Sequence, residues 1–98
     1  MSKRIEDYLS HAEILAQLAE EASELAQAAL KLRRVLDAQN PTPVNFADAY
    51  GNLVEEYSDV VNCMRELNVT YSVDIISRKK ERWIQRLEQR EGFYEKVN

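Results

Sequence analysis

Apolar side chains recur every three or four residues through most of the chain, which is the spacing of one face of an α-helix. The first apolar stripe alternates steps of three and four and comprises Leu15, Leu18, Ala22, Leu25, Ala29, Leu32 and Leu36. A second stripe follows the same rule and comprises Phe46, Tyr50, Leu53, Tyr57, Val60, Met64 and Leu67. Two heptad stripes joined by a short connection predict two antiparallel helices that pack along these positions.

Capping residues mark where the first two helices begin. Ser10, with Glu13 three residues later, is the signature of a capping box and predicts a helix over about residues 11–37. Asn45 is a favourable N-cap and predicts a second helix over about residues 46–68. Pro41 and Pro43 lie between the two, and proline removes backbone donors that a continuing helix needs. This segment is therefore predicted to be the connection.

A third helix is expected over about residues 73–91. Ser72 or Asp74 would start it, and Gly92 is a plausible C-terminal stop. Residues 3–9 add one helical turn before the first main helix. The expected fold is therefore a single all-α domain over residues 1–98, an antiparallel bundle of three main helices. An odd number of helices leaves one face uncovered, so we expect a homodimer or homotetramer that completes four-helix packing.

Composition and charge exclude several classes of function. Thirteen basic and 17 acidic residues give a net charge of −4, which disfavours binding to nucleic acid. The single cysteine, Cys63, cannot form an intramolecular disulfide, so nothing points to an oxidising compartment. The apolar runs are too short to span a membrane, and no signal-peptide pattern follows Met1. These features predict a cytoplasmic protein with neither a membrane nor a nucleic acid as partner.

Four acidic residues stand in matching register on the first two predicted helices. Glu21 and Glu24 each precede a stripe position by one residue. Glu56 and Asp59 do the same on the second helix. Antiparallel packing places such positions opposite each other, so Glu21 and Glu56 are expected to meet. At ~1.5 Å rise per residue, the two pairs also lie at nearly the same height.

Carboxylates that converge on one flank of a core repel each other strongly unless a cation joins them. An all-oxygen donor set suits Mg²⁺, with Mn²⁺ as the other possibility. A di-iron site would need Glu-x-x-His pairs, which the only histidine, His11, does not form. The alternative is that these acids simply form the solvated face of amphipathic helices.

The third predicted helix is basic. Residues 78–90 contain six basic and two acidic residues, a local charge of +4 that leaves −8 for the rest of the chain. Lys79, Arg82 and Arg86 share one helical face. A positive stripe beside a metal–carboxylate cluster would suit a polyphosphate. The alternative is a solvated face that pairs with the acidic helices, and Trp83 more often marks a core or an interface than a stacking platform.

Together these motifs resemble the MazG-like all-α nucleoside triphosphate pyrophosphohydrolases. That family carries Glu-Glu-x-x-Glu, then Glu-x-x-Asp, then a basic helix with Lys-x-x-Arg. The chain matches with Glu20-Glu21-x-x-Glu24, Glu56-x-x-Asp59 and Lys79-x-x-Arg82 followed by Arg86, over about residues 10–90. The resemblance implies Mg²⁺ ligands (Glu21, Glu24, Glu56 and Asp59) and phosphate contacts (Lys79, Arg82 and Arg86).

The activity implied by the resemblance is hydrolysis of a ribo- or deoxyribonucleoside triphosphate to its monophosphate and pyrophosphate. Glu21 or Glu56 would orient the attacking water or act as base, and Trp83 or Tyr50 would lie near the base or ribose. A single histidine and a single cysteine leave no Ser-His-Asp or Cys-His arrangement for covalent catalysis. The alternative function is a non-catalytic helical interaction module or a nucleotide-binding module.

Overall fold

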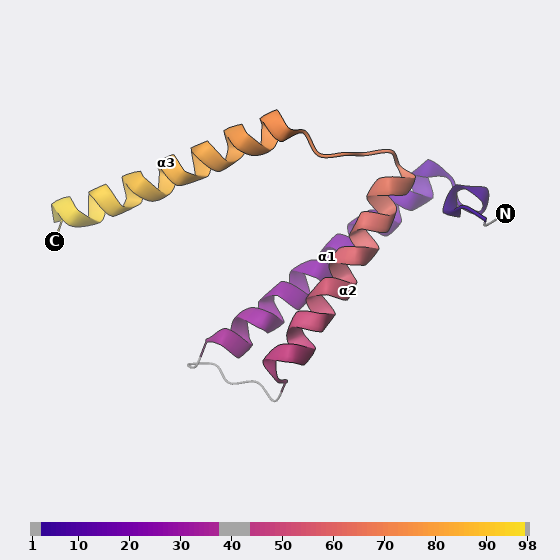
Figure 1. Cartoon of the computed structure of the whole chain (residues 1–98), viewed down its shortest axis with the longest axis horizontal. Helices are drawn as coiled ribbons and strands as arrows, with labels where there is room; N and C mark the ends of the chain where they lie inside the picture. The colour runs from indigo at the N-terminus through magenta and orange to yellow at the C-terminus, as the bar shows by residue number, and fades with distance from the viewer. Residues whose placement is uncertain (1–2, 38–43, 98) are drawn as a thin grey trace.

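The computed structural model describes residues 3–37 and 44–97, with side chains described up to residue 91. In this part of the chain the only regular structure is helical, as predicted: η1 (Ile5–Asp7), α1 (His11–Leu36), α2 (Phe46–Glu66) and α3 (Val73–Val97). α1 and α2 form an antiparallel hairpin, and α3 projects away from it (Figure 1). The predicted connection through Pro41 and Pro43 lies outside the described residues.

Local side-chain hydrogen bonds set the start of each main helix. The Ser10 hydroxyl accepts from the Glu13 N–H at 3.2 Å, and the Glu13 carboxylate accepts from the Ser10 N–H at 3.0 Å. This second bond lowers the pKa of Glu13. The Asn45 side chain accepts from the Asp48 N–H at 2.8 Å. The Ser72 hydroxyl accepts from the N–H of residue 75 at 3.3 Å, so Ser72 caps α3.

α2 ends in a Schellman motif, in which a left-handed residue turns the chain back onto the last carbonyls. Asn68 has a φ of 57°, in the left-handed region. The Val69 N–H donates to the Met64 carbonyl at 2.9 Å, and the Asn68 N–H donates to the Arg65 carbonyl at 3.1 Å. Asparagine tolerates this conformation better than most residues. The chain therefore leaves α2 abruptly before α3 begins.

The predicted end of α3 is wrong. We expected a stop near Gly92, but the helix continues to Val97. Glycine ends a helix by adopting a positive φ, and no glycine among the described residues does so. No proline follows to force a break, so the helix absorbs the cost of about 1 kcal/mol that an internal glycine carries.

The contact between α1 and α2 is shifted by one residue from the predicted stripe. Four of the side chains described are buried: Ile14, Ala28, Ala49 and Cys63, with 1, 2, 0 and 7% exposure. In α1 the packed seam keeps Leu18, Leu25 and Leu32 but replaces the other predicted positions with Ile14, Glu21, Ala28 and Val35. In α2 it comprises Ala49, Leu53, Glu56, Val60, Cys63 and Leu67.

The shift leaves half of the predicted stripe exposed on one flank. We call this flank the apolar face of the hairpin; it comprises Leu15, Ala22, Ala29, Leu36, Phe46, Tyr50 and Tyr57, all exposed. The seam and the predicted stripe share three of their seven positions on α1, and each replaced position lies about 100° from its predicted neighbour. The sequence favoured the stripe that lacked glutamates. Tertiary packing instead places Glu21 and Glu56 between the helices.

A glutamate ties the N-terminal turn to the far end of α2. The Glu66 carboxylate, 14% exposed, accepts from the Glu6 N–H at 2.9 Å. Arg4 lies 3.0 Å from the Glu6 carboxylate and 3.8 Å from that of Glu66. Glu66 thereby anchors η1 beside the start of α1. No helix in the described part of the chain combines the length and hydropathy that a membrane crossing requires.

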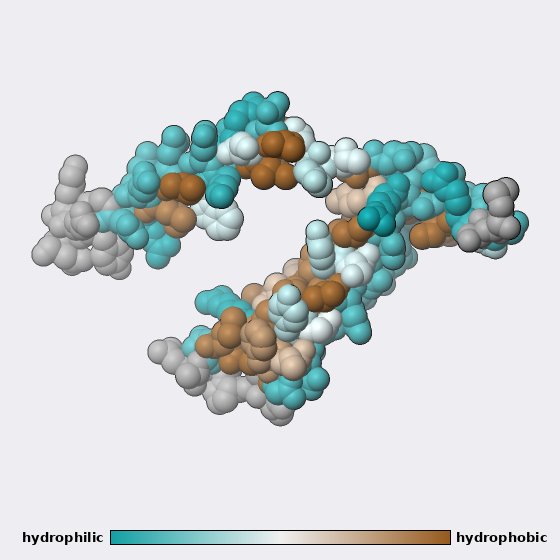
Figure 2. Space-filling view, viewed as in Figure 1, coloured by the Kyte–Doolittle hydropathy of each residue, from teal (hydrophilic) through white to brown (hydrophobic). Residues whose placement is uncertain are grey.

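The molecule is far more extended than its length requires. Its radius of gyration is 18.5 Å, whereas a compact domain of this size has about 13 Å. α3 lies outside the packed hairpin (Figure 1). Figure 2 shows apolar residues on the hairpin and on the side of α3 that borders the open space between them. The single chain therefore leaves two apolar surfaces without a partner.

Candidate metal centre

Three glutamates meet midway along the hairpin. Glu21 and Glu24 of α1 and Glu56 of α2 each offer a carboxylate oxygen, and these oxygens all lie within 4.8 Å of one another. Glu21 and Glu56 are half-buried because they occupy the seam, whereas Glu24 is exposed on its edge. The helical register therefore brings three of the four predicted carboxylates together.

Two carboxylate oxygens in this cluster are buried without a hydrogen-bond partner: Oε2 of Glu21 and Oε2 of Glu56. The other oxygen of Glu21 accepts from the Gln17 side-chain amide at 2.7 Å. A buried charged oxygen without a partner is costly, and native proteins rarely leave one unpaired. These two atoms are therefore the feature of the hairpin that most needs a ligand.

Mutual repulsion in the cluster shifts the ionisation of its exposed member. The charge of Glu21 raises the pKa of Glu24, and the neighbouring Glu56 raises this pKa further. Burial raises the pKa of the Cys63 thiol, with additional effects from the charges of Glu21 and Asp59. Further negative charge in the middle of the hairpin is therefore unfavourable. A bound cation would reduce the repulsion between the carboxylates.

The residues present fit a hard divalent cation. Mg²⁺ prefers oxygen ligands, usually a few carboxylates together with water and substrate oxygens. Glu21, Glu24 and Glu56 supply only oxygen donors, from two helices that are already packed together. The two buried oxygens without partners are available to such an ion.

Asp59, the fourth predicted ligand, lies outside this group of three. It is exposed on α2, one turn beyond Glu56. Its charge reaches Cys63, whose pKa it raises. In the single chain the candidate centre is therefore a cluster of three carboxylates with Asp59 at its border.

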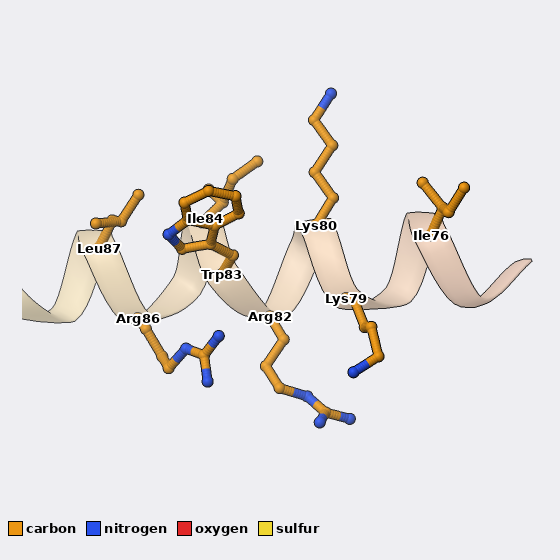
Figure 3. Close-up of a pocket in the computed structure, with 8 residues that line it drawn as sticks. All are labelled: Ile76, Lys79, Lys80, Arg82, Trp83, Ile84, Arg86 and Leu87. Atoms are coloured by element: carbon orange, nitrogen blue, oxygen red, sulfur yellow. The ribbon is translucent and has the colours of Figure 1, made fainter. Parts of the chain in front are cut away.

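The predicted phosphate-binding cations lie on α3, which projects away from the hairpin that carries the carboxylates (Figure 1). Figure 3 shows Lys79, Arg82 and Arg86 extending to one side of the helix. Lys80 extends to the other side, together with the apolar side chains of Ile76, Trp83, Ile84 and Leu87. These residues border a depression of about 690 Å³ whose lining residues all come from α3. The single chain thus does not bring these cations to the carboxylate cluster.

The structure reveals a groove that the sequence analysis missed. It has a volume of about 470 Å³ and lies between α1 and α2, next to the cluster. Glu24 and Glu56 border it together with six other residues: Gln27, Ala28, Leu30, Lys31, Arg34 and Asn52. The signal was present in the sequence, because Lys31 lies seven residues after Glu24 and so shares its helical face.

The aromatic residues expected near a base lie elsewhere. Tyr50 stacks on Phe46 with ring centroids 5.9 Å apart, and both rings belong to the apolar face. Trp83 is 62% exposed on the apolar side of α3. Neither lines the groove beside the glutamates. Tyr8 is likewise exposed, near the N-terminal end of the hairpin.

Comparisons with family models, with curated proteins and with solved structures found no match. The resemblance to MazG-like pyrophosphohydrolases rests on the order of three motifs along the chain: Glu20-Glu21-x-x-Glu24, Glu56-x-x-Asp59 and Lys79-x-x-Arg82. The first two motifs contribute the three clustered glutamates, and the third lies on α3.

Proposed function

We propose that the protein is a Mg²⁺-dependent nucleoside triphosphate pyrophosphohydrolase of the MazG-like type. The observation that carries this proposal is the pair of buried carboxylate oxygens without partners, on Glu21 and Glu56, within a cluster that also includes Glu24. Buried carboxylate oxygens without partners destabilise the centre of a helical hairpin. A cation and its polyphosphate ligand would satisfy them.

In this proposal Glu21, Glu24 and Glu56 hold the cation, and Mn²⁺ would substitute for Mg²⁺. When bound, the ion supplies neutralisation of phosphate charge and polarisation of the phosphorus. Glu21 and Glu56 orient a water molecule for attack in line with the bond between the α and β phosphates, and one of them accepts its proton. The resemblance adds Asp59, one turn from Glu56, as a further ligand of the ion.

Assembly is part of the proposal because the single chain exposes too much surface. A compact monomer of this mass would expose about 5,800 Å², whereas the chain exposes 8494 Å². The excess of roughly 2,700 Å² is larger than the ~800 Å² that each partner buries in a standard interface. A homodimer or homotetramer would cover the apolar face and the apolar side of α3. It would also allow Lys79, Arg82 and Arg86, with Trp83 and Tyr50, to approach a substrate.

One observation favours a second candidate function, a non-catalytic interaction module. α3 offers a long amphipathic face, with Ile76, Ile84 and Leu87 at 49, 43 and 45% exposure, and no part of the hairpin covers it. An exposed apolar helix face of this kind is typical of a protein-binding surface. In this reading the glutamates would be surface charge alone.

The test is a direct assay for the reaction products. The protein is incubated with Mg²⁺ and a panel of ribo- and deoxyribonucleoside triphosphates, and the products are separated by chromatography. Glu56→Gln is assayed alongside, with Glu55→Gln as the matched control because Glu55 is exposed and lies outside the cluster. We expect monophosphate and pyrophosphate from the parent and from Glu55→Gln, and none from Glu56→Gln.

Three other outcomes would contradict the proposal. A nucleoside diphosphate would mean that a different phosphoanhydride bond is cut. Equal activity in Glu56→Gln and the parent would remove the cluster from the reaction. No product from any nucleotide, with a folded chain, would favour the interaction module.

A further inference from the structure

The groove beside the cluster carries opposite charges at its two ends. Glu24 and Glu56 stand at one end, and Lys31 and Arg34 line the groove further along α1. Lys31 lies seven residues beyond Glu24, about 10 Å at the rise of an α-helix. Asn52 lies four residues before Glu56 and, because the helices are antiparallel, borders the same stretch. A ligand in this groove would meet carboxylates first, then an amide and two cations.

We propose that Lys31 and Arg34 bind the terminal phosphates of a metal-bound polyphosphate whose cation lies at the glutamates. This inference rests on the proposed function and adds a phosphate subsite within the same chain. A polyphosphate that carries its own divalent cation matches the order of charges along the groove. A purely anionic ligand would be repelled by the glutamates at one end of the groove. An uncharged ligand would leave the charges at both ends without a partner.

The helix dipole explains the position of Arg34 but not that of Lys31. Arg34 lies in the last turn of α1, where cations are favourable without any ligand. Lys31 lies before that turn, and it is half-buried in the groove wall rather than extended into solvent. Lys31 is therefore the residue whose position the dipole does not explain.

The groove stays open when the apolar face is covered. Glu24 and Lys31, three positions after Glu21 and Ala28, lie on one flank of the hairpin. Ala22, one position after Glu21, lies on the other flank, which is the apolar face. A second copy seated on the apolar face would therefore leave the phosphate subsite accessible. α3 is not needed to form it.

The test measures binding of inorganic triphosphate in millimolar Mg²⁺ by isothermal titration calorimetry. Lys31→Gln and Arg34→Gln are compared with the parent and with Arg33→Gln, a neighbouring cation outside the groove. We expect Lys31→Gln and Arg34→Gln each to weaken binding by about tenfold, the effect of one lost charge-assisted contact. Arg33→Gln should bind like the parent. Circular dichroism and the molar mass in solution verify that each variant is folded and assembled.

A second readout separates the phosphate subsite from the metal centre. Lys31→Gln should keep the rise in melting temperature that Mg²⁺ alone produces in the parent, because its glutamates are intact. If Lys31→Gln and Arg34→Gln bind triphosphate like the parent, the inference fails. If Lys79→Gln loses binding while Lys31→Gln does not, the cations of α3 form the subsite instead. In either case hydrolysis by the parent still supports the proposed function, whereas a parent that neither binds triphosphate nor cleaves nucleotides overturns both.

Discussion

Glu21 and Glu56 occupy seam positions where apolar residues would pack better. Their neighbours along the seam are Leu18 and Leu25 on α1 and Leu53 and Val60 on α2. Each glutamate carries a buried oxygen without a hydrogen-bond partner. Residues that violate the local rule for a stable core usually do so for function. This violation identifies the candidate centre more directly than the motif spacing does.

Removing one of these charges should stabilise the metal-free protein. Glu56→Gln replaces a repelled, unpaired carboxylate with an amide that can donate to a neighbouring carboxylate. We expect the free energy of unfolding in chelator to rise by about 1 kcal/mol. Urea denaturation at fixed protein concentration measures it. Mg²⁺ should then stabilise the parent and not the variant.

Glu55→Gln is the control for this experiment, since it makes the same change on an exposed side chain next to the cluster. Its stability should match that of the parent with and without Mg²⁺. A loss of stability in Glu56→Gln in chelator would show that the Glu56 carboxylate already has a partner, which contradicts the structure.

The raised pKa of Glu24 predicts how stability depends on pH. The charge of Glu21 makes the folded state hold the Glu24 proton to a pH above the ordinary value of 4.5. Stability from this group is therefore fully present below pH 4.5 and is lost as the pH rises through the folded pKa. Glu24→Gln should be more stable than the parent at neutral pH in chelator, and this difference should shrink on acidification.

Urea denaturation across this pH range measures the difference, with Glu20→Gln as the control because Glu20 is exposed and lies outside the cluster. A difference between Glu24→Gln and the parent that does not change with pH would mean that Glu24 does not interact with Glu21 in solution.

Helix boundaries in this chain follow local chemistry at the starts of α1 and α2 and at the end of α2. The starts of α1 and α2 were predicted from Ser10 and Asn45 because a cap bonds within its own first turn. The end of α2 depends on a single residue with positive φ, Asn68. That residue also sets the direction in which α3 leaves the hairpin.

The stability of the turn should depend on how well the residue at position 68 tolerates a positive φ. Asn68→Ala should lower the free energy of unfolding by about 1 kcal/mol, because alanine tolerates a positive φ poorly. Asn68→Gly should be at least as stable as the parent, since glycine adopts this conformation freely. Thermal or urea unfolding measures both variants.

Asn62→Ala is the matched control because it makes the same substitution in the interior of α2, where Asn62 is exposed. It should be neutral or slightly stabilising, since alanine is the better helix former. Equal stabilities of Asn68→Ala and Asn68→Gly would show that the Schellman turn is not required.

The extended shape of the whole molecule leaves many of its large apolar side chains exposed. Among the side chains that the structure describes, the hairpin buries four residues in its core, and α3 adds none. α3 also carries charge opposite to the rest of the chain, +2 against −6. Apolar and electrostatic complementarity therefore both favour α3 packing on the hairpin of a second copy.

Charging the apolar side of α3 should dissociate the assembly. Leu87→Glu places a carboxylate between Trp83 and the end of the helix, on the side that Figure 3 shows to be apolar. We expect the parent to elute at a multiple of 11.4 kDa and Leu87→Glu to shift toward the monomer mass. Size-exclusion chromatography with light scattering measures it.

Gln85→Glu is the control because it adds the same charge on the opposite side of α3. It should keep the mass of the parent. A parent that elutes as an 11.4 kDa monomer would contradict the assembly, and it would leave the exposed side of α3 for a different protein.

The sequence by itself determined the all-α class, the three main helices and the starts of α1 and α2, because caps and helical periodicity act within a few residues. It also placed Glu21 opposite Glu56, since both stripes share one register. It did not determine which of two adjacent stripes packs. The apolar pattern favoured Leu15, Ala22 and Tyr57, and only the packed hairpin placed the glutamates in the seam.

The tertiary structure also decided which residues of different helices come together, which the periodicity of a single helix does not specify. Asp59 matches the motif but lies outside the cluster of Glu21, Glu24 and Glu56. Lys31 carries no motif but lines the groove, because α2 lies alongside it. The place of α3 depends on contacts between residues far apart in sequence or in separate chains. Local sequence patterns therefore predict helices well, whereas sites depend on which faces meet.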